Sequence, residues 1–365
     1  MNAAEYYNKV YGGWLGRVAG SHFGAPLEFR PTWFTLSRYG RLTETGDREI
    51  SYYVKPVNPD AVNDDEIYQI IGLVALEKYG TNLTTKQLGE EWRQRLYRQQ
   101  FTAEKVAFEN LKRGIEAPDC ASPENGNFWF DAIGAQMKAD IWGLVTPNCP
   151  ELAAEYARID GAVAHQGTGI DGEVFIAGII SQAFGEPDVK NSIQNALELL
   201  PPESEYRRFV ERTLQIHQQH PRADQWRQAH ALLMQEWTRV RMQLLRESKS
   251  FGRQIYLRFL HGLHVLPNAG IIVMSLLYAQ GHPDPFGRAL SLAGMMGMDT
   301  DCNCGNIGTI MGTILGADRL PTPWTDPLRD TFHTYVRGYE DWKISELAKR
   351  ICAAGERIVE ARCKK

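Results

Sequence analysis

Late in the chain the sequence reads Gly297-Met298-Asp299-Thr300-Asp301-Cys302-Asn303 and continues into an apolar segment that ends at Gly316. The apolar residues of this segment recur at helical spacing and predict a helix over 302–316. They are Ile307, Ile310, Met311, Ile314 and Leu315. The other face of this helix carries four glycines, Gly305, Gly308, Gly312 and Gly316. Because each interior glycine costs roughly 1 kcal/mol relative to alanine, the stripe predicts that another backbone approaches this face closely.

A second glycine stripe lies near the N-terminus, within Tyr11–Phe29. It consists of Gly12, Gly13, Gly16, Gly20 and Gly24. Helices striped in this way can pack tightly, so we expect their loop ends to meet around one small volume. This arrangement would bring Glu28, which follows the first stripe, near Asp299 and Asp301.

A second acidic cluster, Asn63-Asp64-Asp65-Glu66, precedes a helical pattern of Ile67, Ile70, Ile71 and Val74. Asn63 fits an N-cap and Glu66 would close a capping box. Acids in a first turn also complement the helix dipole, which is the alternative interpretation of this cluster taken alone. Two such crowded clusters in one chain nevertheless favour a shared cation site, since a bound cation offsets the repulsion between carboxylates.

The donor types in these clusters match a hard divalent cation. Carboxylate and amide oxygens suit Mg²⁺ or Mn²⁺, whereas zinc favours histidine and thiolate pairs that these segments lack. The predicted ligands are Asn63, Asp64, Asp65, Asp299 and Asp301, with Glu28 as a further ligand or a gate. The base that accepts a proton from water is Asp65 or Asp301, and the sequence does not choose between them. It also identifies no general acid.

Three segments resemble, in the right order, the motifs of the ADP-ribosylglycohydrolase family, which includes the dinitrogen-reductase-activating glycohydrolases. They are Gly12–Gly20 through Glu28, Asn63–Asp65 and Gly297–Gly316. Two shorter segments resemble the family's glycine-rich ligand loop, at Ile133–Lys138, and the segment that places a histidine near the bound ribose, at Ala164-His165. The match spans nearly the whole chain.

This resemblance implies an all-α fold, a single compact orthogonal bundle of helices that covers residues 1–365. It also implies a site with two divalent cations, Mg²⁺ or Mn²⁺, and hydrolysis of a glycosidic bond to the anomeric carbon of an ADP-ribosyl group. The substrate would be an ADP-ribosylated protein, nucleic acid or small compound. The substrate-binding residues carried over from the family pattern are Gly134, Ala135, Gln136 and His165.

The chain departs from the family pattern at three positions. The family often has threonine where this chain has Asn63 and Cys302, and aspartate where it has Ser21. Cys302 would offer a soft sulfur to a hard ion, so one of the two metal sites is expected to be altered, weaker or missing. These changes leave open a hydrolase of a smaller riboside. A non-catalytic binding or structural member, like the lens crystallins that resemble this family, is a third alternative, although the retained acids argue against it.

Several further residues have two interpretations. His165 is either a core or turn residue or a ligand contact. His261 and His264 could share a helical face and bind zinc, but Pro267 favours a loop there, with Asn268 capping the next helix. The aromatic run Phe128–Phe130 is either core or an adenine-stacking surface.

Composition agrees with an enzyme of this kind. The 365 residues are 43% hydrophobic and carry a net charge of -4 with interspersed signs, so no basic footprint for nucleic acid is present. No apolar run approaches the roughly 20 residues needed to span a bilayer. The six cysteines form no C-x-x-C pair and indicate no disulfide framework, and the first residues do not resemble a signal peptide; we therefore expect a cytoplasmic location.

Helical patterns fill almost all of the chain. They predict helices over 2–23, 64–79, 85–98, 102–114, 130–143, 150–163, 170–185, 189–199, 204–219, 223–246, 268–280, 285–296, 302–316 and 339–362. Only Glu49–Val57 suggests an extended segment. Residues 215–250 are the most polar part and predict a solvated helical hairpin, with a partner-binding insertion as the alternative.

Overall fold

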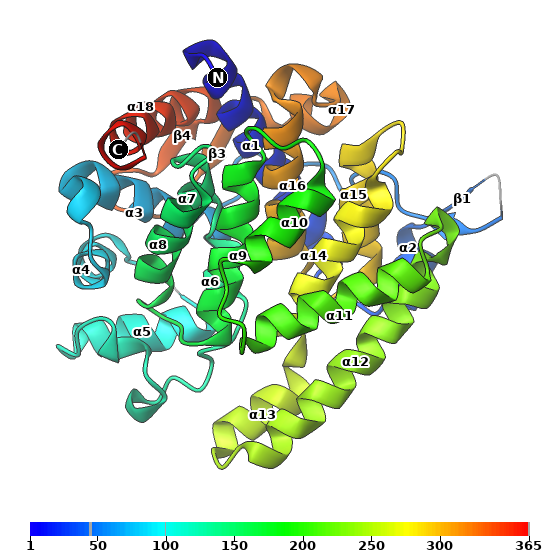
Figure 1. The fold of residues 1–365 in the computed structure, drawn as a ribbon, viewed down its shortest axis with the longest axis horizontal. Helices are drawn as coiled ribbons and strands as arrows, with labels where there is room; N and C mark the ends of the chain where they lie inside the picture. The colour runs from blue at the N-terminus through cyan, green and yellow to red at the C-terminus, as the bar shows by residue number, and fades with distance from the viewer. Residues whose placement is uncertain (44–45, 99, 364–365) are drawn as a thin grey trace.

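The computed structural model describes residues 1–43, 46–98 and 100–363 and confirms the all-α fold (Figure 1). Its longer helices are α1 (Ala3–Gly24), α2 (Thr32–Tyr39), α3 (Asp64–Tyr79), α4 (Thr85–Arg95), α5 (Thr102–Lys112), α8 (Pro150–Gly161), α9 (Thr168–Gln182), α10 (Val189–Leu197), α11 (Glu205–Gln219), α12 (Trp226–Glu247), α13 (Phe251–Phe259), α14 (Val265–Ala279), α15 (Pro285–Met296), α16 (Thr300–Leu315) and α18 (Ile344–Arg362). The short ones are α6 (Gly134–Met137), α7 (Asp140–Leu144) and α17 (Thr322–Thr325). Two antiparallel pairs of short strands join β1 (Arg41–Leu42) to β2 (Arg48–Glu49) and β3 (Thr331–His333) to β4 (Asp341–Lys343).

Helices α1 and α16 run antiparallel with their glycine faces in contact. A Cβ added at Gly16 would overlap the carbonyl oxygen of Gly308, and one added at Gly308 would overlap that of Gly16. The same fit recurs where Gly12 faces Gly312. The predicted close approach of the two stripes is therefore confirmed, and each stripe is the partner of the other.

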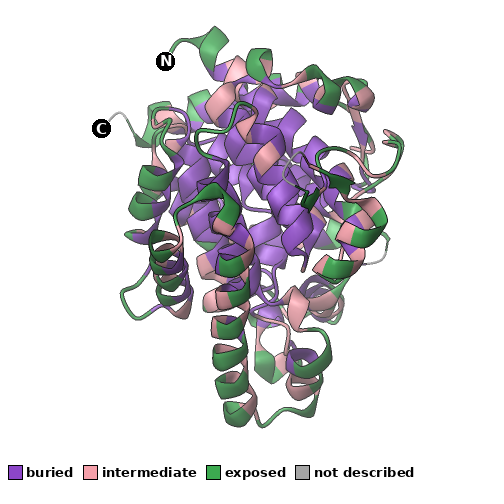
Figure 2. Cartoon of the chain, turned by 90° about the vertical axis from the view of Figure 1, so that its right-hand side faces the viewer, coloured by how far each residue is buried: buried purple, intermediate pink, exposed green. Residues whose placement is uncertain are grey.

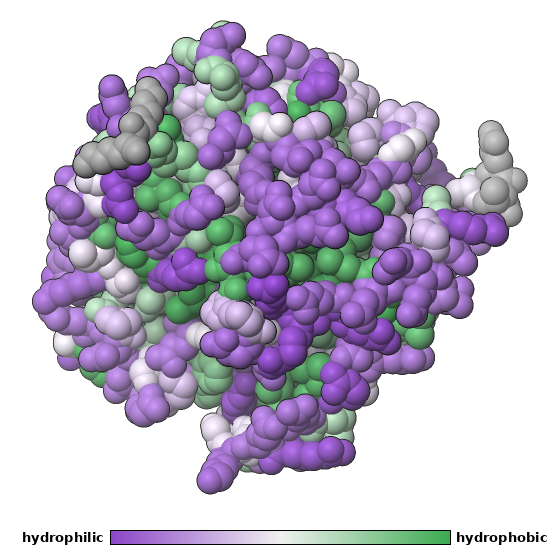
Figure 3. Space-filling model, in the orientation of Figure 1, coloured by the Kyte–Doolittle hydropathy of each residue, from purple (hydrophilic) through white to green (hydrophobic). Residues whose placement is uncertain are grey.

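The core surrounds this pair. Every residue of α14 is buried, which explains why its sequence is apolar on all sides. By contrast α11 and α12 bury only one face, against α14, and expose their charged residues. Figure 2 shows buried helices through the centre and exposed turns where α12 and α13 extend downward. Figure 3 shows hydrophilic residues spread over most of one face, with apolar ones between them.

The predicted helix over 130–143 is wrong, because the chain is interrupted there. Residues before α6 instead pair with the segment that precedes α14: the N–H of Ile133 donates to the carbonyl of Leu263 (2.9 Å), and that of Val265 donates to the carbonyl of Asp131 (3.1 Å). The side chain of Asp131 is also held by Arg253 at 2.6 and 3.0 Å. These long-range bonds compete with the local helical ones, and only the short helices α6 and α7 remain.

The start of α14 also differs from the prediction. The helix begins at Val265, and His264 is its N-cap, with Nδ1 accepting from the N–H of Leu266 (3.2 Å). Pro267 lies within the first turn, where its missing N–H removes no helical hydrogen bond. Asn268 is therefore inside the helix rather than at its cap, and its side chain is available for hydrogen bonds to other segments.

Five segments were not predicted as regular structure: α2, α13, α17, β1 and the β3–β4 hairpin, whose second strand occupies the start of the helix predicted over 339–362. All are short, and short elements depend on tertiary packing more than on local pattern. The extended segment expected over Glu49–Val57 contributes only Glu49 to a strand.

The structure joins Cys149, before α8, to Cys363, after α18, in a disulfide with Cα atoms 6.7 Å apart. The absence of a local cysteine pattern had indicated no pairing, and the 214-residue separation explains why the sequence carried no such signal. Within the described residues, no helix is long and apolar enough to cross a membrane.

The glycine contact generates a stability prediction. Gly16→Ala should lower the free energy of unfolding by about 3 kcal/mol, because the new methyl group meets a backbone carbonyl that cannot rotate away. Gly89→Ala is the matched control: it also lies in a helix, and its methyl group would meet only side-chain carbons of Ala117 and Leu111 at 3.0 and 3.1 Å. Urea unfolding followed by circular dichroism compares the two; equal losses would contradict the close-packing argument.

Candidate metal centre and active site

A cavity of about 430 Å³ lies where the two acidic clusters meet. Its acidic lining residues come from four parts of the chain and include every carboxylate predicted from sequence. They are Glu28, Asp64, Asp65, Glu104, Asp299 and Asp301. The other lining residues are Phe29, Phe101, Thr102, Ile133, Gly134, Met137, Leu263 and Cys302.

The packing of α1 on α16 places Glu28 at this cavity. Gly24, the last residue of α1, lies against the backbone of Thr300 and Asp301 at the start of α16. The hydroxyl of Thr300 donates to the carbonyl of Gly24 (2.8 Å), and the N–H of Phe29 donates to the carbonyl of Met298 (2.9 Å). These bonds fix the two loop ends together, so Glu28 and Asp301 face the same cavity.

Asp64 and Asp65 reach the cavity from the first turn of α3. The side chain of Asn63 accepts from the N–H of Asp65 (3.1 Å), so its amide oxygen serves as the N-cap that the sequence predicted. Asn63 is not among the cavity-lining residues. Asp64 is half-buried and Asp65 fully buried, which is costly for carboxylates unless a positive charge is close.

Arg17 supplies that charge for the inner carboxylates. Its side chain is 1% exposed and lies 2.8 Å from Asp65, 3.5 Å from Glu66 and 3.1 Å from Asp140. It packs over Gly305, where any side chain would collide with the guanidinium. Arg17 thus joins α1, α3, α7 and α16, and it fixes the position of Asp65 from behind the cavity.

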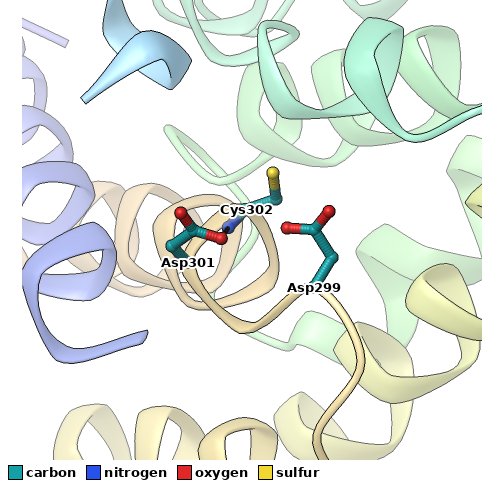
Figure 4. Close-up of side chains that lie close together, drawn as sticks. All are labelled: Asp299, Asp301 and Cys302. Atoms are coloured by element: carbon teal, nitrogen blue, oxygen red, sulfur yellow. Dashed lines mark hydrogen bonds between the residues drawn. The ribbon is translucent and has the colours of Figure 1, made fainter. Parts of the chain in front are cut away.

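Asp299, Asp301 and Cys302 offer donor atoms that all lie within 4.8 Å of one another, which makes them a candidate metal centre. In Figure 4 the two carboxylates point toward each other, with the thiol beside them. Asp299 is buried, and its Oδ1 has no hydrogen-bond partner among the described residues. Its N–H donates to the Asn268 side chain (3.2 Å), which also receives a bond from the Asn303 amide (2.7 Å). Asn268 thereby holds the loop that carries Asp299.

The cavity carries more negative charge than the protein neutralises. Burial, followed by the charges of Asp301 and Asp64, raises the pKa of Glu28 to about 8. Burial and Asp301 raise the pKa of Asp64 to about 6, and burial raises the pKa of Asp299 well above its usual range. Crowded, partly unpartnered carboxylates of this kind fit a divalent cation.

The side chain of Cys302 is a neutral thiol in this site. Burial, followed by the neighbouring Asp299 and Asp65, raises its pKa well above the usual value. Its sulfur lies 3.3 Å from Oδ1 of Asp65, to which it donates. The thiol therefore supports Asp65 by a hydrogen bond in the absence of a cation.

The predicted substrate-binding residues do not all reach the cavity. Gly134 lines it, whereas Ala135 and Gln136 are buried outside it. The Gln136 side chain accepts from the hydroxyl of Tyr206 (2.7 Å). His165 is also fully buried, and its Nε2 lies 3.6 Å from Glu104, which stands between it and the cavity. Burial lowers the pKa of His165 to about 3, so its imidazole is neutral.

Sequence reasoning did not identify Glu104, the remaining cavity carboxylate. Glu104 is 2% exposed, and burial raises its pKa to about 7. One of its oxygens has no hydrogen-bond partner among the described residues. A signal was present: Glu104 stands in register with Phe108 and Leu111, so it interrupts the apolar face of α5.

The other uncertain residues pack away from the cavity. The rings of Phe128 and Trp129 pack against each other, and that of Trp129 packs against Tyr256, both at tilted angles in a small apolar cluster under α13. His264 caps α14 and lies 3.2 Å from Asp131. Its neighbour His261 accepts from the indole N–H of Trp237 (3.3 Å).

The family model for ADP-ribosylglycohydrolase matches residues 2–360. The chain belongs to the ADP-ribosylglycohydrolase family. This is a family of glycohydrolases, so membership indicates a hydrolase. Among solved structures, the chain is similar to an "ADP-ribosylglycohydrolase-related protein complex", with 15% identity, a TM-score of 0.59, and coverage of 97% of this chain and 99% of that one. This similarity supports the shared fold. No curated protein matches the sequence.

The raised pKa values predict an unusual pH dependence of stability. The ordinary pKa values of Glu28 and Asp64 are 4.5 and 3.8, against about 8 and about 6 in the folded chain. A folded state that binds protons more tightly than the unfolded state loses stability as pH rises between the two values. In chelator, the midpoint of thermal unfolding should therefore fall from pH 5 to pH 8.

Glu28→Gln should flatten the upper part of this decline, and Glu360→Gln, an exposed control, should not. Differential scanning calorimetry across this pH range measures both. A midpoint that rises through the range in the wild type, or a decline that Glu28→Gln leaves unaltered, would contradict the electrostatic account.

Proposed function

We propose that this chain is a divalent-cation-dependent hydrolase that cleaves the glycosidic bond of an ADP-ribosyl group. The observation that carries the proposal is the convergence of six carboxylates, from four separated parts of the chain, on one cavity. Family membership supplies the reaction class. The cavity volume, about 430 Å³, falls in the range of ligand sites.

The residues that would hold the cations are Asp64, Asp65, Asp299 and Asp301, with Glu28 at the edge of the cavity. We propose two ions, Mg²⁺ or Mn²⁺, with the second held less tightly because Cys302 offers a neutral sulfur where an oxygen would suit a hard ion. When bound, such cations supply orientation of the ribose hydroxyls and polarisation of a water molecule.

Asp301 is the better candidate for the base. Both oxygens of Asp65 are engaged, one by Arg17 at 2.8 Å and the other by the thiol of Cys302 at 3.3 Å. Asp301 is half-buried, and its Oδ1 accepts from the N–H of Cys302 (3.0 Å). We assign Asp301 to take the proton of the attacking water and Asp65 to position the neighbouring groups.

We assign Glu104 as the general acid of the reaction. In the reaction the bond from the anomeric carbon to the leaving nitrogen or oxygen breaks, and its electron pair goes to the leaving atom. A carboxyl group with a pKa of about 7 is substantially protonated at neutral pH and can give its proton to that atom. The water oxygen forms the new bond to the anomeric carbon, and the proton it loses goes to Asp301.

Further contacts to the ribosyl part would come from the glycine-rich loop. Gly134 lines the cavity, and we propose that its backbone meets the ribose. Ala135, Gln136 and His165 would act from the layer behind, where the Nε2 of His165 lies 3.6 Å from Glu104.

The metal assignment is tested by removal of one charge at constant size. Asp299→Asn and Asp301→Asn should each weaken Mn²⁺ binding and leave helix content unchanged. The loss of affinity should exceed the roughly 10- to 100-fold that follows removal of a residue that only supports a metal ligand. Calorimetric titration of chelator-treated protein, with and without ADP-ribose, measures this. Asp119→Asn, on an exposed turn, is the control.

Ion binding that tightens with ADP-ribose is the expected wild-type result. Ion binding without a response to ADP-ribose would contradict the assigned substrate and favour a smaller riboside. Full affinity in both variants would contradict the metal site.

The role of Glu104 makes a separate prediction for pH profiles. Only the protonated acid is active, so kcat should fall as pH rises through about 7. Glu104→Gln should lower kcat roughly 10²- to 10⁴-fold and remove this alkaline decline. Hydrolysis of an ADP-ribosylated peptide across pH 5–9 measures both. A decline that persists in the variant would assign it to another group.

A further inference from the structure

The outer face of α13 is apolar although it is exposed. Phe251, Ile255 and Phe259 recur at every fourth residue, so they form a row along one side of the helix. Their exposed fractions are 78%, 38% and 73%, and Leu260, which follows the helix, is exposed as well. A single exposed apolar residue is ordinary, but several on one helix face indicate an interaction surface.

The opposite face of α13 is fixed to the body of the protein. Tyr256 and Leu257 on that face are fully buried. The guanidinium of Arg253 donates to the side chain of Asp131 at 2.6 and 3.0 Å. A rotation of the helix that buried the apolar row would break this ion pair and expose two core residues, so the row stays at the surface.

Positive charge accompanies the row. The segment Arg241–Leu260 contains four arginines and one lysine against a single glutamate, in a chain whose net charge is -4. Arg246, Lys249 and Arg258 are exposed, and in the part of the chain that the structure describes none of them forms an ion pair. The surface therefore combines apolar side chains with uncompensated positive charge, which favours an anionic occupant.

The shape of this region suits a broad surface. Helix α13 and the end of α12 extend away from the core of the molecule (Figures 1 and 2). A row of side chains on such a projection can enter a flat, deformable layer, whereas recognition of a peptide helix uses a groove that encloses it.

A second copy of this chain fits the row less well. Helix α13 has only nine residues. The row on so short a helix offers far less than the roughly 800 Å² per partner that a stable interface buries. A two-fold contact would also bring the same arginines and lysine of both copies together, and these like charges repel.

We propose that α13 docks this chain on the surface of a membrane that contains anionic lipids. The apolar row would enter the boundary between headgroups and acyl chains, and the three exposed cations would meet the negative headgroups. Contact of this kind lies along the surface and requires no spanning helix. It requires neither a bound cation nor a substrate, so it is tested independently of the hydrolase activity.

The docking helix is connected to the acidic cavity. Asp131, the partner of Arg253, closely precedes Ile133 and Gly134, which both line that cavity. Docking through α13 would therefore fix the orientation of the cavity relative to the membrane.

The test is co-sedimentation of the full chain, in chelator, with vesicles of equal parts phosphatidylserine and phosphatidylcholine. The wild-type protein should bind these vesicles and should be released as the salt concentration rises, because salt screens the attraction to anionic lipids. Binding to vesicles of phosphatidylcholine alone should be weaker by about tenfold or more.

Phe251→Ser should weaken binding to the anionic vesicles by about tenfold, because the apolar ring no longer enters the lipid boundary. Leu42→Ser is the matched control, since Leu42 is 70% exposed on β1, which lies apart from α13 in Figure 1. This control should leave binding unchanged. Circular dichroism should show the same helix content in both variants, because both side chains are exposed.

The charge contribution has its own pair of variants. Arg258→Gln should weaken binding to the anionic vesicles and reduce its dependence on salt. Arg38→Gln, which removes the same charge from an exposed position on α2, should do neither.

Absence of vesicle binding, binding that salt does not alter, or equal losses in Phe251→Ser and Leu42→Ser would overturn the proposal. Sedimentation equilibrium examines the second copy: a dimer that Phe251→Ser dissociates, in a chain that does not bind vesicles, would overturn the membrane assignment. Binding of poly-glutamate in place of the vesicles would also overturn it and would assign the surface to an acidic protein partner.

Discussion

The contact between α1 and α16 is the constraint on which the site depends. Two backbones meet there with only hydrogen atoms between them, because a Cβ on either Gly16 or Gly308 would overlap the opposite carbonyl. The antiparallel direction matters as much as the closeness. It brings the end of α1 to the start of α16, and Glu28 and Asp301, 273 residues apart in sequence, then face one cavity.

Charge balance explains why the site is organised in two layers. Arg17 lies behind the cavity and compensates Asp65, Glu66 and Asp140, which are all buried. Removing a partner from such a group would leave an uncompensated buried charge, which costs far more than an exposed pair gains. Among the described residues that line the cavity, the outer layer has no basic side chain of its own. Its excess of carboxylates therefore favours protonation in the free protein and a divalent cation when one is present.

The local sequence pattern was enough to predict those helices whose capping residues and apolar residues indicate the same limits. Helices α3 and α15 were predicted at their observed limits, because capping residues and apolar spacing give the same answer at both ends. The same local signals identified Glu28, Asp64, Asp65, Asp299 and Asp301, all of which the structure brings to one cavity.

Tertiary structure decided what depends on distant partners. The break between α6 and α7 follows from bonds to Leu263 and Arg253, which no window of sequence around residue 133 contains. Asn268 looked like a helix cap and instead holds the Asp299 loop. Glu104 was overlooked because its importance comes from burial beside Gly134, not from its neighbours in sequence. The sequence by itself determined which acidic side chains are candidates for the site and which glycines allow close contact; the packed fold decided which of them meet, because burial and charge compensation act between residues that are far apart along the chain.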